Sequence, residues 1–225
     1  MNIASFIDHT ILKPTTTIQE VEKLCAEAVA YGFAAVCVPP PYVKRAATIL
    51  APTRVKVATV VGFPFGYAAT EAKVAEAVLA IVDGAQEIDM VINLIALKQA
   101  DWTYLQREVA LLVEVCHNKG RLLKVIIESG ILSPEEIRGC CEKLGSLGID
   151  FMKTSTGYAE QGASVEAVQL MRACLPPHVQ IKASGGIRDF AFAASLVEAG
   201  ANRLGCSASL AIVSGGPSAT TEKGY

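Results

Sequence analysis

The stretch LLKVIIESGILSPEEIRGCCEKLGSLGIDFMK (Leu122–Lys153) contains one complete unit of the repeating pattern that decides the fold. It begins with a short apolar run, Leu122–Ile127, which predicts a strand buried on both faces. The segment Ser133–Glu136 then supplies a helix start, with a capping serine, a proline at the first helical position and an acid three residues after the serine. After the helix, the apolar run Phe151–Lys153 predicts the next strand.

The same alternation of short apolar runs and amphipathic stretches extends over most of the chain. The first helix is predicted to begin after Thr17, which forms a capping box with Glu20, and to end at Gly32. Asp189 is the predicted N-cap of the stretch that ends at Gly200. The other predicted strands are Ile3–Ile7, Ala34–Val38, Val55–Val61, Glu87–Ile92, Gln180–Ala183 and Arg203–Cys206.

Eight strands that alternate with helices in 225 residues predict an α/β fold, a single-domain (β/α)8 TIM barrel. An open, doubly wound sheet is the alternative that the alternation alone leaves open. We expect the barrel to occupy residues 1–213. Residues 214–225 (SGGPSATTEKGY) are rich in Gly, Pro, Ser and Thr, which predicts a flexible polar C-terminal tail.

The composition excludes several classes of function. A net charge of −2 gives no electrostatic reason to expect nucleic acid or an anionic membrane as a partner. No stretch approaches the roughly 18 apolar residues of a spanning helix, and the first residues lack a signal-peptide pattern. The seven cysteines, without metal-binding spacing, predict reduced thiols in the cytoplasm and no metal site.

Three predicted strands contain charged groups that apolar packing does not explain. These are Asp89 in EIDMVIN, Lys153 in FMKTSTG and Lys182 in IKASGG. Each has a structural alternative, because a lysine near a strand end can extend to solvent and an aspartate can cap a loop. In a TIM barrel, however, the carboxyl ends of the strands build the active site, and side chains of consecutive strands lie side by side.

Two neighbouring buried lysines would change each other's ionisation. At about 4 Å and an effective dielectric constant of about 20, their repulsion is roughly 4 kcal/mol. Relieving it would lower the pKa of one lysine by about three units from about 10.4. The pair Lys153 and Lys182 therefore predicts a neutral amine that attacks a carbonyl group.

Glycines after the last two predicted strands indicate a phosphate site. Gly185 and Gly186 follow the seventh strand, and Gly205 and Ser207 lie at the end of the eighth. In this fold the loops after strands seven and eight often hold a phosphate through backbone N–H groups. Glycines also serve ordinary turns, so this signal is weaker than the lysine pair. The motif G-x-G-x-x-G is absent, which leaves a dinucleotide site without support.

Six motifs resemble the deoxyribose-phosphate aldolase family, and they occur in that family's order over nearly the whole chain. They are DHTILKP (Asp8–Pro14), CVPP (Cys37–Pro40), VVGFPFG (Val60–Gly66), EIDMVIN (Glu87–Asn93), FMKTSTG (Phe151–Gly157) and KASGGIR (Lys182–Arg188).

The resemblance implies a class I aldolase that reversibly cleaves 2-deoxy-D-ribose 5-phosphate to D-glyceraldehyde 3-phosphate and acetaldehyde. It implies that Lys153 forms the Schiff base, that Lys182 depresses its pKa and relays protons, and that Asp89 serves in acid–base steps through water. No metal or other cofactor is implied, because the protonated imine is the electron sink. The family also implies a homo-oligomer, a dimer or a tetramer.

Further residues follow from the resemblance. Gly157 joins the phosphate-binding glycines and Ser207, while Asp8, Cys37 and Thr154 are expected to support the site. Some relatives have a mobile tail ending in a tyrosine that enters the site, and we expect Tyr225 to do so, with a disordered tail as the alternative.

The chain departs from the family pattern in three places. Leu94 and Ile95 replace a usual Ile-Gly pair after the fourth strand, and Ala208 replaces a serine in the phosphate motif. Tyr158 stands where some members place a phosphate-binding lysine. These changes predict an altered loop and an altered phosphate site.

Two other functions are compatible with parts of the pattern. The first is a different barrel enzyme acting on a phosphosugar, either another lysine-dependent aldolase or an isomerase. The second is a catalytically silent barrel that binds a phosphosugar. An isomerase would accumulate no covalent lysine adduct, and a silent barrel would lack a chemical residue, whereas Asp89, Lys153 and Lys182 are all present.

Overall fold

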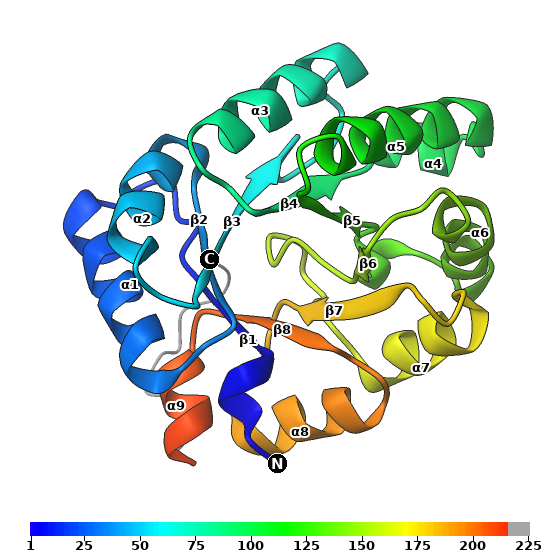
Figure 1. Cartoon of the computed structure of the whole chain (residues 1–225). Coiled ribbons are helices and arrows are strands. Elements are labelled where there is room, and N and C mark those ends of the chain that lie inside the picture. The colour runs from blue at the N-terminus through cyan, green and yellow to red at the C-terminus, as the bar shows by residue number, and fades with distance from the viewer. Residues whose placement is uncertain (216–225) are drawn as a thin grey trace.

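The computed structural model describes residues 1–215, in which eight parallel strands close into a barrel in the order β1 to β8. Helices surround the barrel (Figure 1). The prediction of a (β/α)8 barrel is therefore confirmed, and the open sheet is excluded. The strands are β1 Ile7–Thr10, β2 Ala35–Val38, β3 Lys56–Val61, β4 Glu87–Val91, β5 Leu122–Ile126, β6 Phe151–Lys153, β7 Gln180–Ser184 and β8 Arg203–Cys206.

The helices α1 to α8 lie in the connections between successive strands, and α9 follows β8. Of three short 3-10 helices, η1 precedes β1 and the other two lie in connections. The α-helices are α1 Ile18–Tyr31, α2 Val43–Leu50, α3 Thr70–Val82, α4 Leu94–Lys98, α5 Trp102–His117, α6 Pro134–Gly145, α7 Val165–Cys174, α8 Phe190–Glu198 and α9 Ser209–Ser214. The 3-10 helices are η1 Ile3–Phe6, η2 Pro40–Tyr42 and η3 Ser129–Ile131. Helix α9 ends at Ser214, the first residue of the predicted tail. Residues 216–225 of that tail lie outside the described residues.

The predicted first strand, Ile3–Ile7, was wrong. Residues Ile3–Phe6 form η1, and β1 begins at Ile7 and continues through the polar residues Asp8, His9 and Thr10. These side chains are buried because distant residues satisfy them. The His9 ring, for example, lies 2.9 Å from both the Ser209 hydroxyl and a Glu27 carboxylate oxygen. A polar sequence can therefore form a fully buried strand here.

The predicted helix ends are confirmed. Thr17 accepts a hydrogen bond from the Glu20 N–H at 3.3 Å, and the Glu20 carboxylate accepts one from the Thr17 N–H at 2.7 Å. Gly32 ends α1 in the left-handed conformation, with φ +68°. Ser133 forms the second predicted capping box, and Asp189 accepts from the Phe192 N–H at 2.9 Å.

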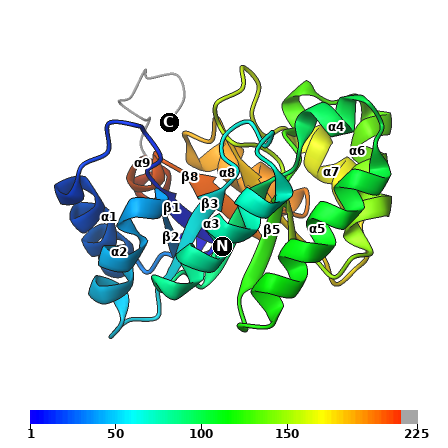
Figure 2. The ribbon, with the colours of Figure 1, turned by 90° about the horizontal axis from the view of Figure 1, so that it is seen from above.

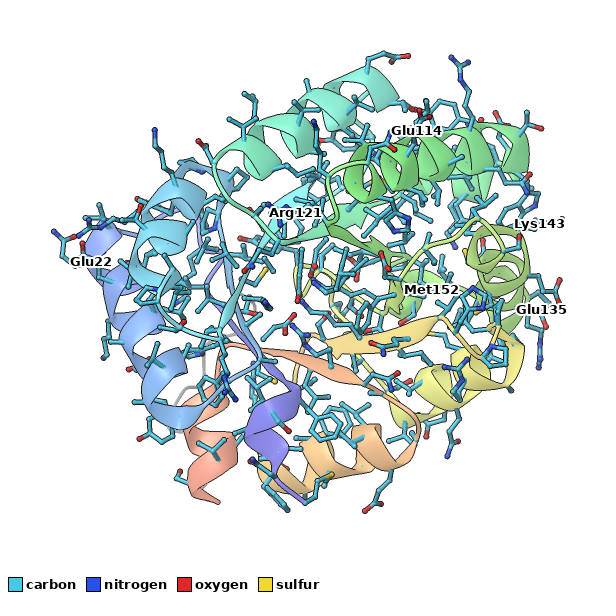
Figure 3. All side chains as sticks on the ribbon, viewed as in Figure 1. Glu22, Glu114, Arg121, Glu135, Lys143 and Met152 are labelled. Carbon is cyan, nitrogen blue, oxygen red and sulfur yellow. The ribbon has the colours of Figure 1, made fainter. Side chains whose placement is uncertain are left out.

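The strands present two different faces. Their outward residues form the main apolar core with the helices; Met152 of β6, for example, lies with its sulfur 3.7 Å from the Cys141 sulfur of α6 (Figure 3). Inside the barrel, a smaller apolar cluster comprises Leu12, Cys37, Ala58 and Val60, with Phe63 against it. The remaining interior is charged and forms the site described below.

Loops after the strands gather at one end of the barrel. Figure 2 shows the loops that follow β3 and β6 rising at the same end. The carboxyl ends of all parallel strands point to this end, which places their terminal side chains together. Among the helices of residues 1–215, none combines the length and the apolar character needed to cross a membrane.

A buried ion pair fastens α3 and α5 to the end of β4. The Lys73 ammonium donates to Glu108 at 2.6 Å and to the Val91 carbonyl at 2.8 Å, while Glu108 accepts from the Asn93 N–H at 3.0 Å. Both side chains are fully buried. Burial lowers the pKa of Lys73 and raises that of Glu108, which disfavours the charged form of both groups. The charge of each partner opposes this effect on the other.

We expect Lys73→Met to lower the free energy of unfolding by about 3 kcal/mol, because it leaves the Glu108 carboxylate buried without its cation. The double variant Lys73→Met/Glu108→Leu should lose less than this single variant. Denaturant unfolding measures both, with Lys119→Met on the surface as the control. A double variant less stable than the single one would contradict the buried-charge explanation.

Candidate active site

Lys153 and Lys182 lie side by side and share one carboxylate oxygen. Their Cα atoms are register partners on β6 and β7. The Lys153 ammonium nitrogen lies 2.8 Å from Asp89 Oδ2, and the Lys182 nitrogen lies 2.7 Å from the same oxygen. The structure therefore brings together the three residues that the sequence singled out, on strands β4, β6 and β7.

A third lysine, which the sequence analysis missed, holds the other oxygen of Asp89. Lys124 of β5 lies 2.7 Å from Asp89 Oδ1 and 2.7 Å from Glu87 Oε2. It is fully buried, and its Cα is the register partner of Asp89. The available signal was a lysine in the middle of LLKVI, a run predicted to be buried on both faces.

Two further groups complete the charged interior. Asp8 of β1 accepts from Lys182 at 2.5 Å and from the Arg203 Nε at 2.7 Å. Arg203 of β8 also donates to Glu87 at 2.9 Å. We call the seven groups the interior charge network; they are Asp8, Glu87, Asp89, Lys124, Lys153, Lys182 and Arg203.

The two lysines of β6 and β7 differ in their ionisation. Burial lowers the pKa of Lys153; Asp89 opposes this effect, and Lys182 adds to it. Burial also disfavours the charged form of Lys182, but Asp8 and Asp89 raise its pKa well above the ordinary value. Of the two, Lys153 is thus the lysine that loses its proton more easily, whereas Lys182 stays charged.

The cause of the lowered pKa differs in part from the one predicted. Repulsion between the lysines was expected to dominate, whereas burial is the larger cause and Asp89 partly offsets it. Asp89 itself remains ionised. Although burial opposes it, Lys124, Lys153 and Lys182 hold the pKa of Asp89 well below its ordinary value. Asp89 is therefore a carboxylate at neutral pH and accepts hydrogen bonds from all three lysines.

Cys37 lies in the apolar half of the barrel, beside the charged groups. It is fully buried, and burial raises the pKa of its thiol to about 11, so it is a neutral group. It packs with Ala58 and Val60. The interior thus combines a charged half with a small apolar half.

A cavity of about 1020 Å³ opens over the ends of β6 to β8. Its lining includes every residue predicted to bind phosphate, namely Gly157, Gly185, Gly186, Gly205 and Ser207. The lining also contains three bases and three acids, so it is mixed in charge; they are Lys13, Lys23, Arg188, Glu20, Glu27 and Glu160. Gly185 and Gly186 have φ values of +89° and +78°, a conformation that glycine adopts readily. The lysine network lies deeper, since Lys153 is only 2% exposed.

Gly205 has a second consequence for the site. A Cβ at this position would lie 2.9 Å from the Ser184 Cβ and 3.2 Å from the Lys182 Cε. The absence of a side chain thus leaves room for Lys182 beside β8. Thr154 supports the same region, because its hydroxyl donates to the Ser184 carbonyl at 3.2 Å.

Tyr158, at the position of the expected lysine, ties two loops together. Its hydroxyl donates to the Leu12 carbonyl at 2.9 Å, and its ring meets Phe63 edge-on at 5.5 Å. The changed pair Leu94 and Ile95 begins α4, which follows β4 directly.

The remaining expectations are placed as follows. Ala208 lines the cavity next to Ser207. Tyr225 lies outside the described residues. No group of three or more His, Cys, Asp or Glu side chains suited to a metal ion occurs in residues 1–215.

Glu128, also missed in the sequence, orients the loop after β6. It accepts hydrogen bonds from the Thr156 N–H at 3.2 Å and the Thr156 hydroxyl at 2.5 Å. Its backbone is left-handed, with φ +55°, which is uncommon for a residue with a side chain. No pattern in the sequence distinguishes this glutamate from a surface one.

Comparison with known proteins agrees with this geometry. Residues 3–215 match the profile of the DeoC/LacD family aldolases. A deoxyribose-phosphate aldolase of Thermococcus gammatolerans is 50% identical, with 96% of each chain covered. One of Exiguobacterium sp. is 48% identical, covering 97% of this chain and 98% of its own. The deoxyribose phosphate aldolase structure from Aeropyrum pernix, described as a unique tetramer, superposes with a TM-score of 0.88 at 32% identity, covering 94% of this chain and 89% of that one.

We expect Gly205→Ala to slow the reaction of Lys153 with acetaldehyde at least tenfold, because the added methyl group would lie 2.9 Å from the Ser184 Cβ and 3.2 Å from the Lys182 Cε and would push both side chains from their places. The rate of adduct formation under cyanoborohydride measures this effect. Gly120→Ala is the control: its φ of +62° costs stability, but no atom lies near the added methyl group. An unchanged rate in Gly205→Ala would show that Lys182 tolerates the methyl group.

Proposed function

The chain belongs to the DeoC/LacD family of aldolases, and we propose that it reversibly cleaves 2-deoxy-D-ribose 5-phosphate to D-glyceraldehyde 3-phosphate and acetaldehyde. It is a carbon–carbon lyase of the Schiff-base class. The observation that carries the proposal is the buried Lys153 amine, with its lowered pKa, bound to the carboxylate it shares with Lys182. The names of the relatives near 50% identity support the choice of substrate.

The reaction begins when the neutral Lys153 amine attacks the aldehyde carbon of the open-chain sugar. The carbinolamine that forms loses water and becomes a protonated imine. Asp89 accepts a hydrogen bond from Lys153 at 2.8 Å and one from Lys182 at 2.7 Å. These two contacts provide a path for protons to and from the Lys153 nitrogen.

Cleavage follows because the imine accepts electrons. The hydroxyl on carbon 3 loses its proton, the bond between carbons 2 and 3 breaks, and its electron pair forms an enamine on Lys153 while D-glyceraldehyde 3-phosphate leaves. Protonation of the enamine carbon and hydrolysis then release acetaldehyde and regenerate the amine. We assign the proton transfers to Asp89, ionised in the resting site, and to Lys182. The lysine imine supplies the electron sink, so this chemistry requires no metal or other cofactor.

The two ends of the substrate suit different parts of the site. The apolar group of Cys37, Ala58 and Val60 suits the methyl and methylene carbons of the acetaldehyde half. The cavity lined by Gly185, Gly186 and Ser207 offers backbone and hydroxyl donors for the phosphate.

We also propose that the chain forms a homo-oligomer. Exposed apolar side chains on α3 support this, since Val78, Leu79 and Val82 are 44%, 65% and 77% exposed. The tetrameric relative from Aeropyrum pernix is consistent with it. The seven cysteines are all free thiols, which supports a reducing compartment such as the cytoplasm.

Borohydride reduction in the presence of acetaldehyde tests the proposal. We expect a reduced two-carbon adduct on the Lys153 peptide, measured by peptide mass mapping. Lys153→Met should give no adduct and no aldol cleavage, and Lys182→Met should remain folded but lose nearly all turnover. Lys143→Met, on the outer surface of α6 (Figure 3), is the matched control and should react normally.

Near-normal turnover in Lys153→Met would overturn the assignment of the nucleophile. The absence of an adduct on folded wild-type protein would favour the catalytically silent barrel. Adduct formation without cleavage of 2-deoxy-D-ribose 5-phosphate would instead indicate another lysine-dependent aldolase.

A further inference from the structure

Glu87 and Arg203 form a charged pair one step below the reactive groups. Glu87 precedes Asp89 by two residues on β4, so it faces inward one layer nearer the amino ends of the strands. Arg203 bridges it to the rest of the network, at 2.9 Å from Glu87 and 2.7 Å from Asp8. Among the described residues, neither member of the pair makes an ion pair or hydrogen bond with Lys153.

The interior charge network contains one more basic group than carboxylates. Three carboxylates face four basic groups, so the network would carry one positive charge if every member were ionised. Cys37 adds no charge, because its thiol is protonated. Of the four bases, Lys153 is the one whose pKa is lowered, while those of Lys124, Lys182 and Arg203 are raised. Within the network the charges balance when Lys153 is a free amine; the buried carboxyl group of Glu128, which follows β5, lies outside the network and also acts on Lys153.

We propose that Glu87 and Arg203 are positioning residues that set, in opposite directions, how readily Lys153 becomes a free amine in the resting enzyme. Arg203 favours the free amine, and Glu87 favours the protonated form. The inference rests on the proposed role of Lys153 as the nucleophile. It assigns a function to two side chains that are not expected to contact the substrate, since they lie below Asp89 and Lys182.

The electrostatic reason is the closure of the barrel. The network receives Asp8 from β1, two acids from β4, and one base each from β5, β6, β7 and β8. Cys37 is the titratable group facing it from β2, and β3 adds the apolar Ala58 and Val60. In such a buried interior, a unit charge is weakly screened and acts beyond its direct partners. Removing one acid or one base therefore changes the cost of protonating Lys153.

The two members of the pair should act in opposite directions. Glu87→Gln leaves the interior more positive, so the protonated form of Lys153 becomes less favourable and its pKa falls. Arg203→Gln leaves it more negative, so the pKa rises. A unit charge at about 10 Å, with an effective dielectric constant of about 20, corresponds to a shift of about one pH unit.

The pH dependence of Lys153 adduct formation tests the proposal, with acetaldehyde and cyanoborohydride as reagents. Relative to wild type, the rise of the rate with pH should move about one unit lower in Glu87→Gln and about one unit higher in Arg203→Gln. The double variant Glu87→Gln/Arg203→Gln removes one charge of each sign, so its profile should return close to that of wild type. Glu135→Gln and Arg107→Gln, both on the exposed outer surface, are the charge-matched controls.

If Glu87 and Arg203 had only structural roles, all three variants would form the adduct more slowly, without opposite shifts of the pH profile. That result would overturn the proposal. A double variant shifted as far as either single variant would also overturn it. If Arg203→Gln does not fold, Arg203→Lys keeps the charge and should retain the wild-type profile; a shift in this variant would contradict the charge explanation. The absence of an adduct in wild-type protein would refute the proposed function itself, which separates the two failures.

Discussion

The structure depends on one buried carboxylate, that of Asp89, which three lysines share. Lys124 binds one oxygen, and Lys153 and Lys182 bind the other, at 2.7 to 2.8 Å. Three buried lysine side chains, at least two of them charged, cannot lie this close without an anion between them, because the repulsion between charged members in a poorly screened interior would exceed what the fold can supply. A closed parallel barrel provides this arrangement. Its inward residues from strands far apart in sequence meet at one level, so that β4 can contribute the anion and β5, β6 and β7 the cations.

The division of the interior into a charged and an apolar half follows from which strands face each other. Strands β2 and β3 contribute Cys37, Ala58 and Val60, whereas the other strands contribute the charges. An apolar wall disfavours a bare ammonium group, and an ion-pair network stabilises one, so a lysine at the boundary experiences both influences. Lys153 has this position: Cys37 and Asp89 both act on it, and burial is the larger cause of its lowered pKa. Lys182, between two carboxylates, remains charged. The two lysines therefore differ through their neighbours and not through their own chemistry.

The sequence predicted what depends on local physics. Helix ends such as Thr17, Ser133 and Asp189 are confirmed because a cap is formed by residues three positions apart. The first strand was misplaced because Asp8 is satisfied by Lys182 and Arg203, which follow 174 and 195 residues later. Lys124, Glu87 and Arg203 escaped notice for the same reason, since a charge inside a predicted strand has no visible partner in the chain. Lys153 and Lys182 were found because consecutive barrel strands are neighbours, which makes their pairing predictable from strand order alone.

The sequence and the structure also differ in the cause that they give for the lowered pKa of Lys153. A single neighbouring cation, the explanation available from the sequence, cannot lower a lysine pKa far when a carboxylate lies 2.8 Å from the same nitrogen. The structure adds two conditions: burial itself disfavours the charge on Lys153, and basic groups outnumber carboxylates by one within the interior charge network. With Asp8, Glu87 and Asp89 each held by basic partners, an additional proton in the interior is uncompensated. It is lost most easily from the base with the fewest anionic contacts, and Lys153 contacts one carboxylate where Lys124, Lys182 and Arg203 each contact at least two. The reactivity proposed for Lys153 is thus a property of the whole ring of strands.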